Sequence, residues 1–248
     1  MTRLRRAGAT SSNWRHCVDT RKAAQTTGAQ AREESLQIPV GKVTLDGDLF
    51  VPGNATGLVV FAHGSGSSRH SPRNRYVAQE LQSRGLATLL FDLLTREEES
   101  YDDTSGRYRF DIPMLGRRLV AVTEHIKMAS GTKKLNLGYF GASTGAGAAL
   151  VAAAEIPGQV KAIVSRGGRP DLAGPALPLV KAPTLLIVGG HDTAVIAMNR
   201  DALARLTTEK ELIIIPGATH LFEEPGALQR VARLAGDWFL KRLTTKVA

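Results

Sequence analysis

Cysteine is almost absent from this chain of 248 residues, and long apolar runs are missing altogether. The single cysteine, Cys17, excludes an internal disulfide and any zinc site built from several cysteines. No stretch approaches the roughly 18 consecutive apolar residues that a membrane span requires. We therefore expect a soluble, cytoplasmic protein that does not enter a membrane.

Acidic residues are also scarce relative to basic ones, and the formal net charge is +9. The first 35 residues hold seven Lys and Arg against three Asp and Glu, so they supply +4 of that charge. The chain has no basic helix with interleaved aromatics and no known nucleic-acid motif, so we expect no nucleic-acid partner. Residues 1–35 lack the apolar core of a secretory signal and read as a disordered basic extension, with organelle import as the alternative.

After residue 35 the sequence changes to an alternation of apolar runs and amphipathic stretches. This pattern predicts one α/β domain over residues 36–248, with a mostly parallel sheet covered by helices on both faces. An Asp46-Gly47-Asp48 turn is expected to close a hairpin near the start, and the acidic segment 92–110 shows no regular apolar period. That segment is short for a cap domain, which predicts an open site. The expected strands cover residues 37–40, 42–50, 57–62, 86–91, 135–140, 160–165, 183–188 and 211–215.

The motif Gly-x-Ser-x-Gly occurs once at a strand-to-helix junction, with Ser143 at its centre. Small residues on both sides of the serine permit a sharp turn, which lifts the hydroxyl above the edge of the sheet. Ser143 is therefore the candidate nucleophile. A glycine-rich turn that binds a phosphate at the helix N-terminus is the alternative.

A serine hydroxyl needs a neighbouring base before it can attack. His220 follows the last predicted strand, and loops at the carboxyl ends of parallel strands share one edge of a sheet. We therefore assign His220 as the base, although a loop histidine can also be a solvated polar residue.

The acid that orients the base should follow another strand, between the serine and the histidine in the chain. Asp192 comes directly after Gly189-Gly190 and fits that order. A capping role at the start of the next helix is the alternative for Asp192 and is compatible with the first. Asp171, behind Pro170, is the rival acid.

Attack on an ester places negative charge on the carbonyl oxygen, which two N–H donors must hold. The N–H of Thr144 is one candidate, and the N–H of Ser65, in a glycine-rich loop after the strand 57–62, is the other. Gly64 is the alternative to Ser65. The same loop could cradle a phosphate, but no G-x-x-x-x-G-K sequence is present.

Four arginines follow strand ends near the expected site and form a possible substrate rim that would attract an anionic substrate. The alternative is that they pair with local acids, in particular those of 97–99 or 102–103. The four are Arg69, Arg73, Arg166 and Arg169.

From about residue 37 to 243 the chain resembles the α/β-hydrolases, and more narrowly the dienelactone-hydrolase-related branch. The resemblance rests on the segments around Gly64, Ser143, Asp192 and His220. It implies an eight-stranded sheet with one antiparallel strand near its start, and no metal or organic cofactor. Dienelactone hydrolases proper use a cysteine where this chain has Ser143, which favours carboxylesterase chemistry.

These observations together predict a serine hydrolase that cleaves small or exposed esters through an acyl-enzyme on Ser143. Two alternatives stay open: an acyltransferase that uses the same three residues, and a binding protein without catalysis. The sequence carries no signal for an oligomeric state or for the natural substrate.

Overall fold

The computed structural model describes residues 30–244, and most of the expected basic extension, residues 1–29, lies outside this range. The sheet begins earlier than the domain boundary at residue 35 that the sequence predicts. Strand β1 (Arg32–Val40) pairs along its full length with β2 (Val43–Val51). The turn of this hairpin lies at residues 41–42, so the expected turn at residues 46–48 is wrong. Asp46 and Asp48 are instead paired within β2, opposite Gln37 and Ser35.

The eight strands form one sheet in the order β1-β2-β4-β3-β5-β6-β7-β8. In the described residues β2 is antiparallel to both of its neighbours, β1 and β4, and all the other pairings are parallel. This confirms the mostly parallel eight-stranded sheet. The remaining strands are β3 (Gly57–Ala62), β4 (Leu86–Phe91), β5 (Leu137–Ala142), β6 (Val160–Arg166), β7 (Thr184–Gly189) and β8 (Lys210–Ile215).

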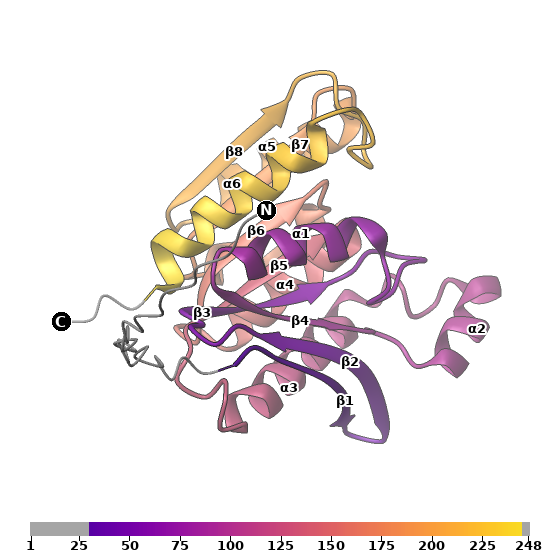
Figure 1. Cartoon of the computed structure of the whole chain (residues 1–248). Helices are drawn as coiled ribbons and strands as arrows, with labels where there is room; N and C mark the ends of the chain where they lie inside the picture. The colour runs from indigo at the N-terminus through magenta and orange to yellow at the C-terminus, as the bar shows by residue number, and fades with distance from the viewer. Residues whose placement is uncertain (1–29, 245–248) are drawn as a thin grey trace, which may run out of the picture.

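Every residue of β3, β4, β5 and β7 is buried, which explains their near-continuous apolar sequences. The helices divide between the two faces of the sheet (Figure 1). One hydrophobic core joins the sheet to α3, α4 and α5, and the other joins it to α1 and α6. These helices are α1 (Pro72–Ser83), α3 (Ile112–Met128), α4 (Thr144–Glu155), α5 (Thr193–Arg205) and α6 (Ala227–Leu243), and a 3-10 segment covers Pro170–Leu179.

The acidic segment that shows no apolar period contains a helix, α2 (Arg96–Ser105), which projects from the sheet edge in Figure 1. Polar contacts rather than an apolar face define it. The Thr95 hydroxyl accepts the N–H of Glu98, and the Glu98 carboxylate accepts the N–H of Thr95. Arg118 of α3 then binds both carboxylate oxygens of Glu98 at 2.6 Å, which fixes α2 to the body.

The parallel strands place several loops at one edge of the sheet. The loops after β3, β5, β6, β7 and β8 all leave from the carboxyl ends of their strands. In α/β proteins this edge carries the ligand site. No helix within residues 30–244 is long and apolar enough to cross a membrane.

Candidate active site

Ser143 lies between β5 and α4 in a conformation that side chains rarely adopt, with φ 50° and ψ −124°. Strand β5 runs directly into it. Two backbone hydrogen bonds maintain the turn: the N–H of Ser143 donates to the Arg166 carbonyl at 3.3 Å, and its own carbonyl accepts the Arg169 N–H at 2.9 Å. The turn of β5 into α4 is therefore secured by the loop after β6.

The second glycine of the motif, Gly145, is required because the backbone at the end of β3 passes too close to leave room for a side chain. A Cβ on Gly145 would lie 2.2 Å from the carbonyl oxygen of Ala62 and 2.4 Å from that of His63. Any side chain there would push the start of α4 away from the end of β3. The glycine thus keeps the Ser143 turn against the loop that holds Ser65.

Asp192 and His220 meet through a hydrogen bond of 2.6 Å between His220 Nδ1 and Asp192 Oδ2. Their loops are joined by the backbone, because the His191 N–H donates to the Ala218 carbonyl at 2.9 Å. The Asp192 side chain makes no capping hydrogen bond to α5, although Asp192 occupies the capping position. With Nδ1–H donated to Asp192, the Nε2 of His220 is left as the acceptor.

The loop after β6 connects the serine to the histidine. Arg166 binds the backbone of Ser143, and a Cβ on the next residue, Gly167, would lie 3.6 Å from His220 Cε1. Among the residues that the structure describes, no hydrogen bond joins the Ser143 hydroxyl to His220. Such contacts are often long in the absence of substrate and shorten in the reacting complex.

The rival acid, Asp171, is held elsewhere. The guanidinium of Arg169 binds both oxygens of its carboxylate, with contacts of 2.8 to 3.2 Å. This bidentate pair occupies Asp171, and the structure records no contact of Asp171 with His220 in the described residues.

The two expected oxyanion donors, the N–H groups of Ser65 and Thr144, lie close together but differ in their hydrogen bonding. The Ser65 N–H donates to the Thr144 hydroxyl at 3.0 Å, and the two hydroxyl groups are also 3.0 Å apart. Within the described part of the chain, the Thr144 N–H donates to no acceptor. The Thr144 N–H is therefore available to a substrate, whereas the Ser65 N–H must leave the Thr144 hydroxyl first. A Cβ on Gly64, the alternative donor, would lie 2.9 Å from Ser143 Cβ, so this loop passes directly beside Ser143.

His63 fastens this loop to the end of β4. Its Nδ1 lies 2.9 Å from the Gly64 carbonyl, and its Nε2 accepts the Leu93 N–H at 2.9 Å. The two contacts require a neutral ring with the proton on Nδ1. Burial lowers the pKa of His63 below its ordinary value, an effect that the Gly64 carbonyl and Asp92 partly oppose.

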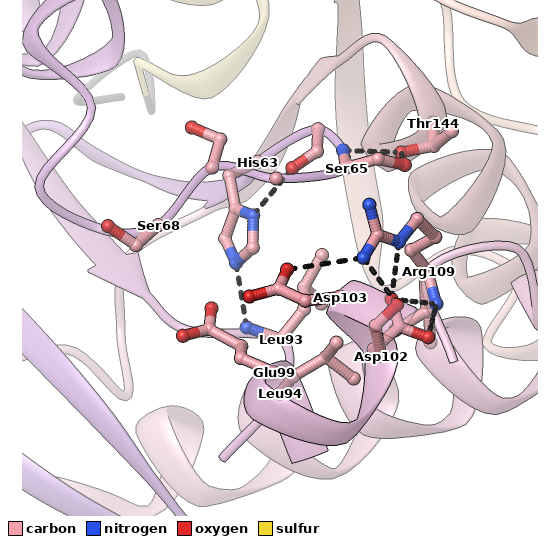
Figure 2. A pocket seen from close by; sticks show the side chains of 14 residues that line it. His63, Ser65, Ser68, Leu93, Leu94, Glu99, Asp102, Asp103, Arg109 and Thr144 are labelled. Carbon is pink, nitrogen blue, oxygen red and sulfur yellow. Dashed lines mark hydrogen bonds and ion pairs between the residues drawn. The ribbon is translucent and has the colours of Figure 1, made fainter. Parts of the chain in front are cut away.

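A pocket of about 280 Å³ opens beside Thr144 and the Ser65 loop (Figure 2). Leu93, Leu94 and Leu115 give it an apolar floor. Residues of α2 and its following turn form the opposite wall, and they include Glu99, Asp103 and Arg109. Sequence patterns do not predict this wall because α2 lacks an apolar period. The one sequence signal for it was the pair of Thr95 and Glu98 three residues apart.

Three of the four rim arginines are paired with carboxylates, although not with the acids that the sequence suggested. Arg69 binds Asp92, Arg73 lies 3.4 Å from Glu223, and Arg169 binds Asp171.

The fourth arginine of the rim, Arg166, is buried and forms no ion pair in the described residues. Its Nη2 lies 3.4 Å from the Asn74 side-chain oxygen, and burial, together with the nearby charge of Arg73, lowers its pKa to about 10. The acids expected to pair with the rim bind other arginines, since Glu98 binds Arg118 and Asp102 binds Arg109.

Comparison with known proteins agrees with this architecture. The model of the dienelactone hydrolase family matches residues 45–239. A crystal structure of a dienelactone hydrolase from Anabaena variabilis is 63% identical, covers 86% of this chain and 99% of its own, and superposes with a TM-score of 0.84. Est1E from Butyrivibrio proteoclasticus is 17% identical, with a TM-score of 0.69 over 84% of this chain and 98% of its own, and it shares the fold.

Two curated relatives from Mycobacterium tuberculosis carry the name "Putative phosphoribosyl transferase" and are 57% identical over 212 residues. The matched region is 86% of this chain but 47% of each relative. The chain thus spans about half the length of these curated relatives.

Proposed function

The chain belongs to the dienelactone hydrolase family, and from this premise we propose that it hydrolyses small or exposed carboxylic esters through an acyl-enzyme on Ser143. One observation carries the proposal. His220 is paired with Asp192 at 2.6 Å, on the same sheet edge as the strained turn of Ser143. This combination of a nucleophile turn, a base and an orienting acid is the arrangement that acyl transfer requires.

In the proposed reaction, His220 Nε2 accepts the proton of Ser143 as the hydroxyl oxygen attacks the ester carbonyl. The Thr144 N–H, at the start of α4, holds the developing oxyanion, and the Ser65 N–H joins it after leaving the Thr144 hydroxyl. The alcohol departs with the proton from His220. Water then gives a proton to His220 and attacks the acyl-enzyme, and His220 returns that proton to the Ser143 oxygen as the acid leaves. Asp192 keeps the imidazole oriented in both steps.

The test is a series of p-nitrophenyl esters assayed with the wild type and with Ser143→Ala. We expect turnover that favours short acyl chains, because the pocket holds only about 280 Å³. Ser143→Ala should reduce kcat by at least about three decades, since loss of the nucleophile removes the covalent route. Ser83→Ala, an exposed serine at the end of α1, is the matched control. Equal turnover by Ser143→Ala and Ser83→Ala would refute the proposal.

An acyltransferase with the same three residues is the alternative within this mechanism. It would pass the acyl group from Ser143 to an alcohol or amine rather than to water. Product analysis with glycerol added as acceptor separates the two. The hydrolase proposal requires free acid as the main product, and predominant glyceryl ester would favour the transferase.

The transferase name of the mycobacterial relatives concerns proteins about twice as long as the matched region. We propose that phosphoribosyl transfer belongs to the part of those proteins that this chain does not match. The match of a hydrolase family model across residues 45–239 supports this division.

A further inference from the structure

The pocket beside Thr144 and the Ser65 loop has a lining with an excess of negative charge. Its lining includes three carboxylates, those of Glu99, Asp102 and Asp103, against one guanidinium, that of Arg109. Arg109 Nε binds Asp102 at 2.5 Å and its Nη2 lies 3.3 Å from Asp103, so the arginine is engaged by both. The lining itself, with three negative groups and one positive group, therefore has a net charge of −2. The arginines of the predicted rim do not line this pocket.

Glu99 is the carboxylate of the pocket without an ion-pair partner among the described residues. It lies on α2 and is half-buried, and Figure 2 shows its carboxylate on the same wall as that of Asp103. Burial, together with the charges of Asp92 and Asp103, raises the pKa of Glu99, and the charges of Arg69 and Arg96 oppose this only in part. A positive charge in the pocket would relieve the same repulsion.

The rest of the lining indicates what kind of cation fits. Leu93, Leu94 and Leu115 are buried beneath the pocket and offer an apolar floor. A bare metal ion would gain nothing from such a floor, whereas the methyl or methylene groups of an alkylammonium would pack on it. The volume of about 280 Å³ lies at the small end of the range for organic ligands.

We propose that this pocket selects esters that carry a small alkylammonium group, which lies on the leucine floor with its charge toward Glu99. The proposal rests on the proposed esterase function, since the pocket adjoins Thr144 and the Ser65 loop of the same site. The cavity wall that α2 forms then determines which class of ester binds, and α2 is the element that sets specificity.

The first experiment compares esters that differ only in charge. On the alcohol side the pair is acetylcholine and 3,3-dimethylbutyl acetate. On the acyl side it is the p-nitrophenyl esters of 4-(trimethylammonio)butanoate and 5,5-dimethylhexanoate. In at least one pair the cationic ester should have a kcat/KM at least about fivefold higher, as expected for a charge held several ångströms from a partly buried carboxylate. This preference should shrink in 0.5 M salt.

Glu99→Gln is the variant that tests the assigned residue, because it keeps the shape of the side chain and removes the charge. The preference for the cationic ester should fall at least about threefold. Glu97→Gln is the matched control, since Glu97 makes the same charge change on an exposed position of α2 that does not line the pocket. Equal kcat/KM values for the cationic and the neutral ester in both pairs would overturn the proposal. An equal loss of the cationic preference in Glu99→Gln and Glu97→Gln would also overturn it.

Binding to Ser143→Ala protein separates this proposal from the esterase proposal. Saturation-transfer NMR with acetylcholine and 3,3-dimethylbutyl acetate reports occupancy without turnover. If no ester is hydrolysed but acetylcholine binds in preference and Glu99→Gln abolishes that preference, the pocket assignment stands and the esterase proposal fails. If neutral esters are hydrolysed and neither kinetics nor binding favours the cation, the esterase proposal stands and the pocket assignment fails.

Discussion

Ser143 shows how much single residues of this site depend on their neighbours. Its backbone, with φ 50°, lies in a region that costs a residue with a side chain roughly 1–3 kcal/mol. The turn persists because the Arg166 carbonyl and the Arg169 N–H bind its two backbone groups. The backbone at the end of β6 and in the loop after it thus supports the Ser143 turn, while the side chains of the same arginines bind Asn74 and Asp171.

Asp192 and Asp171 are the two candidates for the acid that orients His220, and the proposed function assigns this role to Asp192. Asp192→Asn should lower kcat by at least about two decades, because the imidazole loses the acceptor that fixes its tautomer and supports its charge. Asp171→Asn should cost less than about tenfold, since its carboxylate is bound to Arg169. Steady-state kinetics of both variants, with circular dichroism as the folding control, makes the comparison. A larger loss in Asp171→Asn would move the acid to the loop after β6.

The hydroxyl of Thr144 occupies one of the two expected oxyanion donors. It holds the Ser65 N–H at 3.0 Å in the free protein, so it competes with the oxyanion for that donor. Thr144→Val should therefore raise kcat/KM by up to about tenfold, the equivalent of one ordinary hydrogen bond. The same change leaves the Ser65 N–H without a partner and should lower the melting temperature.

Thr144→Ser, which keeps the hydroxyl, is the control for this substitution. If kcat/KM falls more than tenfold in Thr144→Val but not in Thr144→Ser, the hydroxyl itself stabilises the transition state and the prediction is wrong.

Among the elements, α2 is the one that the sequence analysis did not find. Nine of its ten residues are charged or are Ser or Thr, so periodicity gives no signal, and its caps and the Glu98–Arg118 pair define it instead. The buried strands were predictable because a strand covered on both faces needs an unbroken apolar run. The early turn was misplaced because Asp46-Gly47-Asp48 has turn composition, yet the pairing of β1 with β2 keeps it extended.

Arg118→Met tests how α2 is held. The substitution leaves Glu98 partly buried without its cation and should destabilise the protein at the lower end of about 3–5 kcal/mol, measured by urea unfolding. Arg117→Met, an exposed position on the same helix, should change stability by less than about 0.5 kcal/mol. Hydrogen exchange should accelerate across 96–105 in Arg118→Met. Unchanged exchange there would show that α2 is held by other contacts.

Across the whole molecule, the sheet order brings loops together that are distant in the chain. The placement of Ser143, Asp192 and His220 at one edge of the sheet could be predicted because parallel strands end on a common edge. The sequence could not show the Ser65–Thr144 contact, the ion pairs of the rim arginines, or the hydrogen bond between His63 and Leu93. These depend on distances between side chains of separate elements, which strand and helix patterns do not encode.

The buried ring of His63 should make global stability sensitive to acid. Its pKa in the folded protein lies below the ordinary value of about 6.5, so below that pH the unfolded chain binds a proton that the native ring refuses. Stability should therefore fall as the pH drops below about 6.5, by up to about 1.4 kcal/mol per pH unit for one proton.

Urea unfolding at pH 7.5 and 5.5 measures this loss. His63→Asn, which cannot titrate, should lose less between the two pH values, whatever its stability at pH 7.5. An equal loss in both proteins would assign the acid sensitivity to other groups.

The claim that Ser143 is an activated nucleophile has one direct measurement, which is labelling with a fluorophosphonate followed by mass spectrometry of the tryptic peptide 135–161. Ser143 is the one serine of that peptide, so an adduct there is unambiguous. The account predicts a single covalent adduct on this peptide in the folded wild type, and none in Ser143→Ala. A folded wild-type protein whose peptide 135–161 stays unmodified would contradict it.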